Sequence, residues 1–136
     1  MKDLSRQYDY LTIEGSGGII CPLVAEGTHS LFLTDVMKLL AVPLIIVAPS
    51  GLGTINSTLL TLDYARSHDL TVGGIILNNW RGGVMEEDNA AMIEQYGQVS
   101  ILAKIKQGQQ DFPIAAAEIT TWYKEVLHHD RLAEGR

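Results

Sequence analysis

Two glycine-rich segments contain residue types that could bind a charged ligand. In the first, Glu14-Gly-Ser-Gly-Gly18, a carboxylate follows a short apolar run and precedes a cluster of glycines. A carboxylate can bind a cation, and the exposed N–H groups of a glycine-rich loop can bind an anion, a combination that suits a magnesium nucleotide. The alternative is a strand that ends in a flexible turn beside an exposed glutamate, and both interpretations stay open at this point.

The second segment, Gly51-Leu-Gly53-Thr-Ile-Asn56, predicts a turn that opens a helix. Unpaired N–H groups and the helix dipole at such a start attract a carboxylate or a phosphate. The segment matches neither common phosphate motif, because Asn56 stands where GxGxxG needs a glycine and the lysine of GxxxxGK[ST] is absent. A tight turn capped by the side chain of Ser50 or Thr54 is the alternative.

A third candidate, Asn78, follows an apolar run. Its amide offers one donor and one acceptor to a base edge, although asparagine in such a place also caps turns. Cys21 and the histidines lack the spacing of a metal site, and Ser16 lacks the GxSxG pattern of a hydrolase nucleophile. The Trp122–Tyr123 pair favours a core or interface stripe over a cofactor site.

The elements that would position these residues alternate between strands and helices. Apolar runs predict strands at residues 10–13, 43–48, 70–77 and 99–105, the second of them covered on both faces. Helical spacing predicts helices at residues 31–40, 54–68, 86–96 and 115–131, and the acidic start of the third suits the helix dipole. This alternation favours a parallel α/β sheet whose binding loops follow the strand ends. Gly73-Gly74 is expected to allow close packing against a neighbouring backbone.

Length and composition limit the possible classes of protein. The 136 residues fit a single α/β domain over residues 1–136, and 46% hydrophobic content excludes global disorder. Sixteen acidic against ten basic residues give a net charge of −6, which argues against a nucleic-acid partner. A single cysteine and the lack of an apolar run of about 18 residues lead us to expect a cytoplasmic protein without a membrane segment.

Three sequence blocks, taken in order, resemble dethiobiotin synthase, the ATP-dependent ring-closing enzyme of biotin synthesis. They are YLTIEGSGGIICPL at residues 10–23, VPLIIVAPSGLGTINSTL at 42–59 and VGGIILNN at 72–79. Wider relatives are the amidoligases and ATPases of the P-loop superfamily. The resemblance implies a P-loop NTPase-like, three-layer sandwich with a parallel sheet. It also implies a ligase in which 7,8-diaminononanoate captures CO₂ as a carbamate, ATP phosphorylates the carbamate, and the second amine closes the ureido ring.

The resemblance also assigns roles to individual residues. Glu14 would help to bind Mg²⁺, and Asn78 would contact the adenine of ATP. The other nucleotide-binding positions would be Gly15, Gly17 and Gly18. The backbone of Gly53, Thr54, Ile55 and Asn56 would hold the distal carboxylate of the substrate, reaching the site of the other subunit in a homodimer.

Two departures from the family pattern qualify these expectations. The GxxxxGK[ST] motif with which the family begins is absent, and Leu102-Ala-Lys-Ile-Lys106 stands where the family has a glycine and a proline. We therefore expect the C-terminal portion of such an enzyme, truncated at the N-terminus, without catalytic residues and inactive as this chain alone. It could be a fragment, half of a split enzyme that needs a separate P-loop-bearing chain, or a shortened paralogue. The competing hypothesis is a non-catalytic binding or scaffold paralogue that keeps dimerisation and carboxylate binding.

Overall fold

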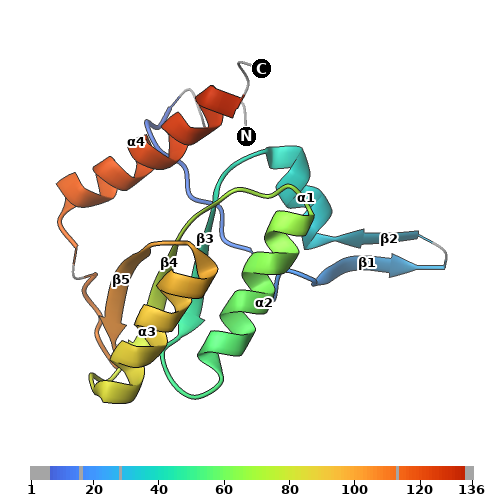
Figure 1. Cartoon of the computed structure of the whole chain (residues 1–136). Helices are drawn as coiled ribbons and strands as arrows, with labels where there is room; N and C mark the ends of the chain where they lie inside the picture. The colour runs from blue at the N-terminus through green and yellow to red at the C-terminus, as the bar shows by residue number, and fades with distance from the viewer. Residues whose placement is uncertain (1–6, 16, 28, 113, 134–136) are drawn as a thin grey trace.

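The computed structural model describes residues 7–15, 17–27, 29–112 and 114–133 of the chain, with strands and helices that largely alternate after an initial hairpin (Figure 1). The elements in order are β1 (Pro22–Glu26), β2 (His29–Phe32), α1 (Leu33–Leu40), β3 (Leu44–Pro49), α2 (Thr54–Ser67), β4 (Val72–Trp80), α3 (Val84–Gly97), β5 (Ile101–Lys106) and α4 (Ala116–Ala133). Helices and strands from β3 to α4 lie where the sequence predicts them, within a few residues at each end.

The sheet has the order β3-β4-β5, and both pairs of strands are parallel. Helices α2 and α3 lie side by side against one face of it (Figure 1). Each connection between neighbouring strands contains a helix, as parallel pairing requires. The expected α/β fold with a parallel sheet flanked by helices is therefore confirmed.

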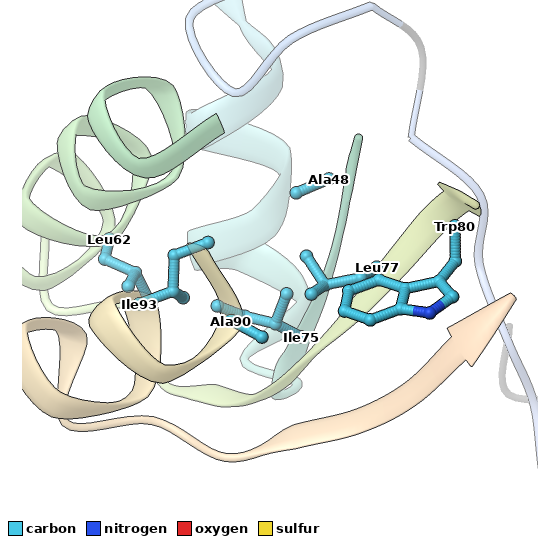
Figure 2. Packing of buried hydrophobic residues seen from close by; sticks show 7 residues of the cluster. All are labelled: Ala48, Leu62, Ile75, Leu77, Trp80, Ala90 and Ile93. Carbon is cyan, nitrogen blue, oxygen red and sulfur yellow. The ribbon is translucent and has the colours of Figure 1, made fainter. Parts of the chain in front are cut away.

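The hydrophobic core fills the space between this sheet and the two helices (Figure 2). Ile75 and Leu77 of β4 are 0% exposed and share the core with Ile93 of α3, because alternate residues of a strand point to the same face. On β3 the alternation leaves Ile45 and Val47 exposed by 42% and 63%. The expectation that β3 is covered on both faces is therefore not met by the described residues.

The expected first strand at residues 10–13 is wrong, because residues 10–15 have no regular secondary structure. This segment packs against α4 instead. The rings of Tyr10 and Tyr123 lie 4.9 Å apart between centroids, and the hydroxyl groups of Thr12 and Tyr123 are in contact. An apolar run becomes a strand only where another strand offers hydrogen-bond partners, and here side-chain contacts take their place.

An antiparallel hairpin of β1 and β2 forms in a stretch for which the sequence predicts no strand. Glu26 and His29 are partners in the ladder, so two residues connect the strands, and Gly27 has a φ of 58° that suits glycine. Leu31 and Phe32, expected in a helix, belong to β2. Helix α1 begins after them, where the Asp35 carboxylate accepts a hydrogen bond of 2.8 Å from Phe32 N.

No helix in the described part of the chain is long and apolar enough to cross a membrane.

Candidate functional site

The carboxyl ends of β3 and β4 lie side by side and carry two of the predicted ligand-binding features. Pro49 and Asn78 are partners in the parallel ladder, and Ser50 N donates a hydrogen bond of 3.0 Å to Asn78 O. In open α/β sheets, ligands bind beyond the carboxyl ends of the strands. The structure thus brings the glycine-rich loop after β3 and the end of β4 to one edge of the sheet.

The loop after β3 turns directly into α2. Gly53 occupies the N-cap position with a φ of 86°, a conformation that suits glycine. Thr54 N donates to Gly51 O at 3.2 Å, and Ser57 N donates to Gly53 O at 3.1 Å. The intervening amides of the first helical turn have no intrahelical acceptor and can therefore bind an anion.

Side-chain capping does not explain this turn. The helix has no side-chain N-cap hydrogen bond, because the Thr54 hydroxyl donates to Pro49 O and the Ser50 hydroxyl points to other partners. Both side chains are buried, at 1% exposure. The alternative of a turn capped by Ser50 or Thr54 is therefore contradicted, and the first-turn amides keep their capacity for a ligand.

Asn78 is exposed at the end of β4. Its Oδ1 accepts a hydrogen bond of 2.9 Å from Asn79 N, which orients the side-chain amide. Asn79 itself has a φ of 58°, in the left-handed region that asparagine tolerates. The Asn78 amide can then donate to an acceptor such as a ring nitrogen of a base.

A hollow of about 630 Å³ lies between the loop after β3 and the turn that leads into α3. It is lined by residues 49–52, 79 and 81–86. Leu52 and Val84 at its rim are 95% and 80% exposed, and Arg81 contributes a positive charge. Its volume is within the range of small-molecule sites. Arg81 is not among the candidate residues of the sequence analysis, so this lining is a finding of the structure.

Glu86 is buried beneath this hollow, with 6% of its surface exposed. Its carboxylate accepts hydrogen bonds from Ser50 Oγ at 2.6 Å, Arg81 N at 2.9 Å and Gly82 N at 2.7 Å. The Ser50 hydrogen bond is the main cause that lowers the pKa of Glu86; burial opposes it, and the two amides and the Arg81 charge assist it. The sequence predicts only that this acidic residue suits the helix dipole.

Asn89 holds the same loop one helical turn further along α3. It is 8% exposed, and its Nδ2 donates to Ser50 O at 3.0 Å and to Gly51 O at 3.4 Å. The first of these bonds gives Ser50 O a partner, and the second adds a donor to Gly51 O, which also accepts from Thr54 N. The spacing of Glu86 and Asn89, three residues apart on a helix, is the one sequence signal that could have indicated a shared role.

The first glycine-rich segment is not part of this sheet edge. Glu14 is exposed in the irregular segment before β1, and a β-carbon on Gly15 would lie 3.3 Å from Leu33 Cδ2 at the start of α1. Gly17 and Gly18 adjoin Cys21, whose N–H donates to Gly18 O at 3.0 Å. In Figure 1 this blue segment runs toward the hairpin, away from the β3–α2 loop at the bottom of the view. The expectation that binding loops follow the strand ends is therefore wrong for Glu14, because the expected strand at residues 10–13 does not form.

Among the described residues, no three side chains of His, Cys, Asp or Glu gather as a metal site. Magnesium is bound through one or two carboxylates together with phosphate oxygens and water. An exposed Glu14 alone does not complete such a site.

Comparison with known families agrees with this fold. A family model described as an AAA domain matches residues 1–110. The chain therefore belongs to this AAA domain family. The match confirms the P-loop NTPase-like character that the resemblance implies.

Individual relatives are more specific. The chain is 41% identical over 118 residues to the ATP-dependent dethiobiotin synthetase BioD of Clostridium botulinum strain Eklund 17B, an alignment that covers 86% of this chain and 51% of that protein. It is 43% identical over 108 residues to the protein of the same name from Brachyspira hyodysenteriae, covering 79% and 49%. The similarity to dethiobiotin synthetases is confirmed, and the chain spans about half the length of the curated relatives it matches.

Proposed function

We propose that this chain provides the carboxylate-binding and adenine-side part of an ATP-dependent dethiobiotin synthetase of biotin synthesis. The reaction would be the closure of the ureido ring of 7,8-diaminononanoate with CO₂. The observation that supports this most directly is the loop of residues 51–56, which opens α2 beside Asn78 at the end of the neighbouring strand.

The proposed roles follow the chemistry of these groups. The turn from Gly53 to Asn56 would hold the distal carboxylate of the substrate, since first-turn amides of a helix bind anions without any charged side chain. The amides of Ile55 and Asn56 would be the main donors, because Thr54 N already donates to Gly51 O. The amide of Asn78 would contact adenine. Positioning of two ligands at one edge lowers the entropic cost of their reaction.

The nucleotide and its magnesium ion would need groups beyond those at this edge. In the proposal Gly15, Gly17 and Gly18 lie near ATP, and Glu14 supplies one carboxylate to a magnesium ion held mainly by phosphate oxygens. A homodimer would bring the α2 loop to the other subunit's site, and a separate P-loop-bearing chain would supply the phosphate-binding loop. We place the protein in the cytoplasm, where its single cysteine stays reduced.

The chain alone is proposed to be inactive, because its sequence has no GxxxxGK[ST] motif. Catalysis of phosphoryl transfer depends on the backbone amides and the lysine of that motif. Formation of dethiobiotin by the purified chain alone would contradict this. A second candidate function is a non-catalytic binding or scaffold protein that keeps carboxylate binding and dimerisation. It is favoured by a helix start whose anion-binding groups are backbone amides, so that binding needs no charged side chain.

Calorimetric titration with 7,8-diaminononanoate tests the proposed site. The Gly53→Val variant should bind at least about tenfold more weakly, because a β-branched side chain would crowd the anion and strain the turn. Gly108→Val is the matched control: both glycines have positive φ, 86° and 75°, and at both a β-carbon would meet no atom within 4 Å, but Gly108 lies after β5. Equal affinity in all three proteins, or none in the folded wild type, would refute the carboxylate site.

A mixing experiment separates the two candidate functions. A P-loop-bearing chain of a dethiobiotin synthetase is added to this chain with ATP, Mg²⁺, bicarbonate and 7,8-diaminononanoate. Production of dethiobiotin above the level of either chain alone supports the split enzyme. Binding of the diamine without production supports the scaffold protein.

A further inference from the structure

Ser50 connects the two loops of the candidate site through all of its polar groups. Its N–H donates to Asn78 O at 3.0 Å, and its hydroxyl lies 3.1 Å from Asn79 O and 2.6 Å from Glu86 Oε1. Its carbonyl oxygen accepts from Asn89 Nδ2 at 3.0 Å. The side chain is 1% exposed, so these bonds are not exchanged with water.

Glu86 connects the same loop to the turn after β4. One carboxylate oxygen accepts from Ser50, and the other accepts from the backbone N–H groups of Arg81 and Gly82. The amides of Glu86 and Glu87 in the first turn of α3 have a different acceptor, because both donate to Gly83 O, at 3.1 and 3.0 Å. The carboxylate therefore does not cap its own helix; it holds together two loops that precede and flank it.

We infer that Glu86 is a positioning residue, which from the first turn of α3 sets the place of the β3–α2 loop relative to the end of β4. The two loops are those that carry the proposed carboxylate and adenine contacts, so the ligand consequences rest on the proposed function. The geometric inference does not, because it concerns hydrogen bonds within the chain itself.

The hydrogen-bond chemistry predicts that glutamine can replace this glutamate. The Glu86→Gln side chain has one oxygen, which can accept from Arg81 N and Gly82 N, and one NH₂ group, which can donate to Ser50 Oγ. The Ser50 proton is then free to go entirely to Asn79 O, which already lies 3.1 Å away. Alanine at the same position keeps none of these bonds. If Glu86 acts by positioning, Glu86→Gln should behave like wild type and Glu86→Ala should not. If its charge is needed, both variants should be perturbed.

Amide hydrogen exchange of the chain without added ligand tests this inference. In Glu86→Ala the protected amides of the β3–α2 loop, Thr54 and Ser57, and those of the turn, Arg81 and Gly82, should exchange about tenfold faster. This factor should exceed the change at Ile75, whose amide bonds Ser100 O in the sheet. Glu86→Gln should stay within about threefold of wild type at these amides, because it keeps the donors and acceptors paired. Glu87→Ala is the matched control, since Glu87 is exposed and pairs with Lys104.

Three results would overturn the inference. In the first, Glu86→Ala speeds exchange of the loop amides no more than exchange of the Ile75 amide. In the second, only the amides of the turn, Arg81 and Gly82, exchange faster. In the third, Glu86→Gln speeds exchange as much as Glu86→Ala does. Should Glu86→Ala fail to fold, Ser50→Ala provides the same test, because it removes the link and leaves the carboxylate bonds to Arg81 and Gly82. It should accelerate exchange at Thr54 while Gly82 stays protected, and unchanged exchange at Thr54 would overturn the inference.

Titration with 7,8-diaminononanoate distinguishes failure of this inference from failure of the proposed function. In one outcome, amide exchange is faster in both loops of Glu86→Ala while wild type does not bind the diamine. This result supports Glu86 as a positioning residue and refutes the proposed ligand. Binding by wild type with the same affinity in Glu86→Ala, and with unchanged exchange, refutes the positioning role and leaves the ligand in place. An affinity lowered at least about tenfold in Glu86→Ala and restored in Glu86→Gln supports both.

Discussion

Gly74 of β4 faces Leu102 of β5 so closely that a β-carbon on Gly74 would lie 2.5 Å from Leu102 Cγ. The sequence predicts close packing at this glycine against backbone, and the structure shows that a side chain is the neighbour. Gly74→Ala should lower the free energy of unfolding by about 1–3 kcal/mol, because the leucine branch point must move within the packed sheet. Gly83→Ala is the control, with an extended φ of 173° and no atom within 4 Å. Chemical denaturation of both variants measures the difference.

Two glycines of the β3–α2 loop should differ in their tolerance of alanine. Gly53 has a φ of 86° and Gly51 is not in the left-handed region, although neither would bring a β-carbon within 4 Å of another atom. Gly53→Ala should therefore cost about 1–2 kcal/mol of stability through backbone strain. Gly51→Ala should stay within about 0.5 kcal/mol of wild type. Equal melting temperatures for the two variants would show that the turn relaxes without strain.

Arg66 joins the carboxyl ends of α2 and α3. Its Nη2 donates to Gly97 O at 2.6 Å and to Gln98 O at 3.2 Å. These carbonyls end a helix, where a positive charge is favourable. Arg66→Ala should lower the free energy of unfolding by about 1 kcal/mol. Arg66→Lys should lose less stability, because lysine keeps the positive charge but not the planar group of donors. Urea denaturation checks this, and a neutral Arg66→Ala would contradict it.

The Glu86 carboxylate should make stability depend on pH in the acidic range. Its hydrogen bond from Ser50 holds its pKa in the folded chain below the ordinary value of 4.5. The stability that it contributes is therefore present above pH 4.5 and is lost as the pH falls through the lower, folded-state value. The free energy of unfolding of wild type minus that of Glu86→Gln should be largest near neutral pH and shrink on acidification. If this difference in the free energy of unfolding grew on acidification, it would contradict a lowered pKa of Glu86 in the folded chain.

Lys104 should matter more for its contact with Trp80 than for its ion pair. Its Nζ lies 2.6 Å from Glu87 Oε2 and 4.3 Å from the centroid of the Trp80 ring. The ion pair is exposed, so Glu87→Ala should change the free energy of unfolding by less than about 0.5 kcal/mol. Lys104→Ala should cost about 1 kcal/mol, because it also removes the cation and the aliphatic stem from the indole ring. A double-mutant cycle would show whether the two losses are independent.

The sequence by itself determined the regular part of the fold from β3 to α4. Continuous apolar runs and helical periodicity are local signals, and glycine and proline punctuate them, so the strands and helices could be placed within a few residues. It also predicted the helix start at Gly53, because a glycine at this position both permits the positive φ and leaves first-turn amides free.

The tertiary structure alone decided what happens before β3. Whether an apolar run becomes a strand depends on a partner for its backbone, and residues 10–13 packed on α4 through Tyr10 instead. A two-residue connection folded the following stretch into a hairpin, which carried Leu31 out of the expected helix. The glycine-rich segment of Glu14 was thereby separated from the sheet edge.

The junction of the two site loops was likewise decided only by the fold. Ser50 and Glu86 are 36 residues apart in the sequence, and each has an ordinary local explanation, one as a turn residue and the other as an acid at a helix start. Their pairing requires β3, β4 and α3 to be packed first, because only that packing excludes water from the carboxylate and aims three donors at it. Local periodicity does not predict such a contact, since it depends on the distance between elements and not on the spacing of residues within one.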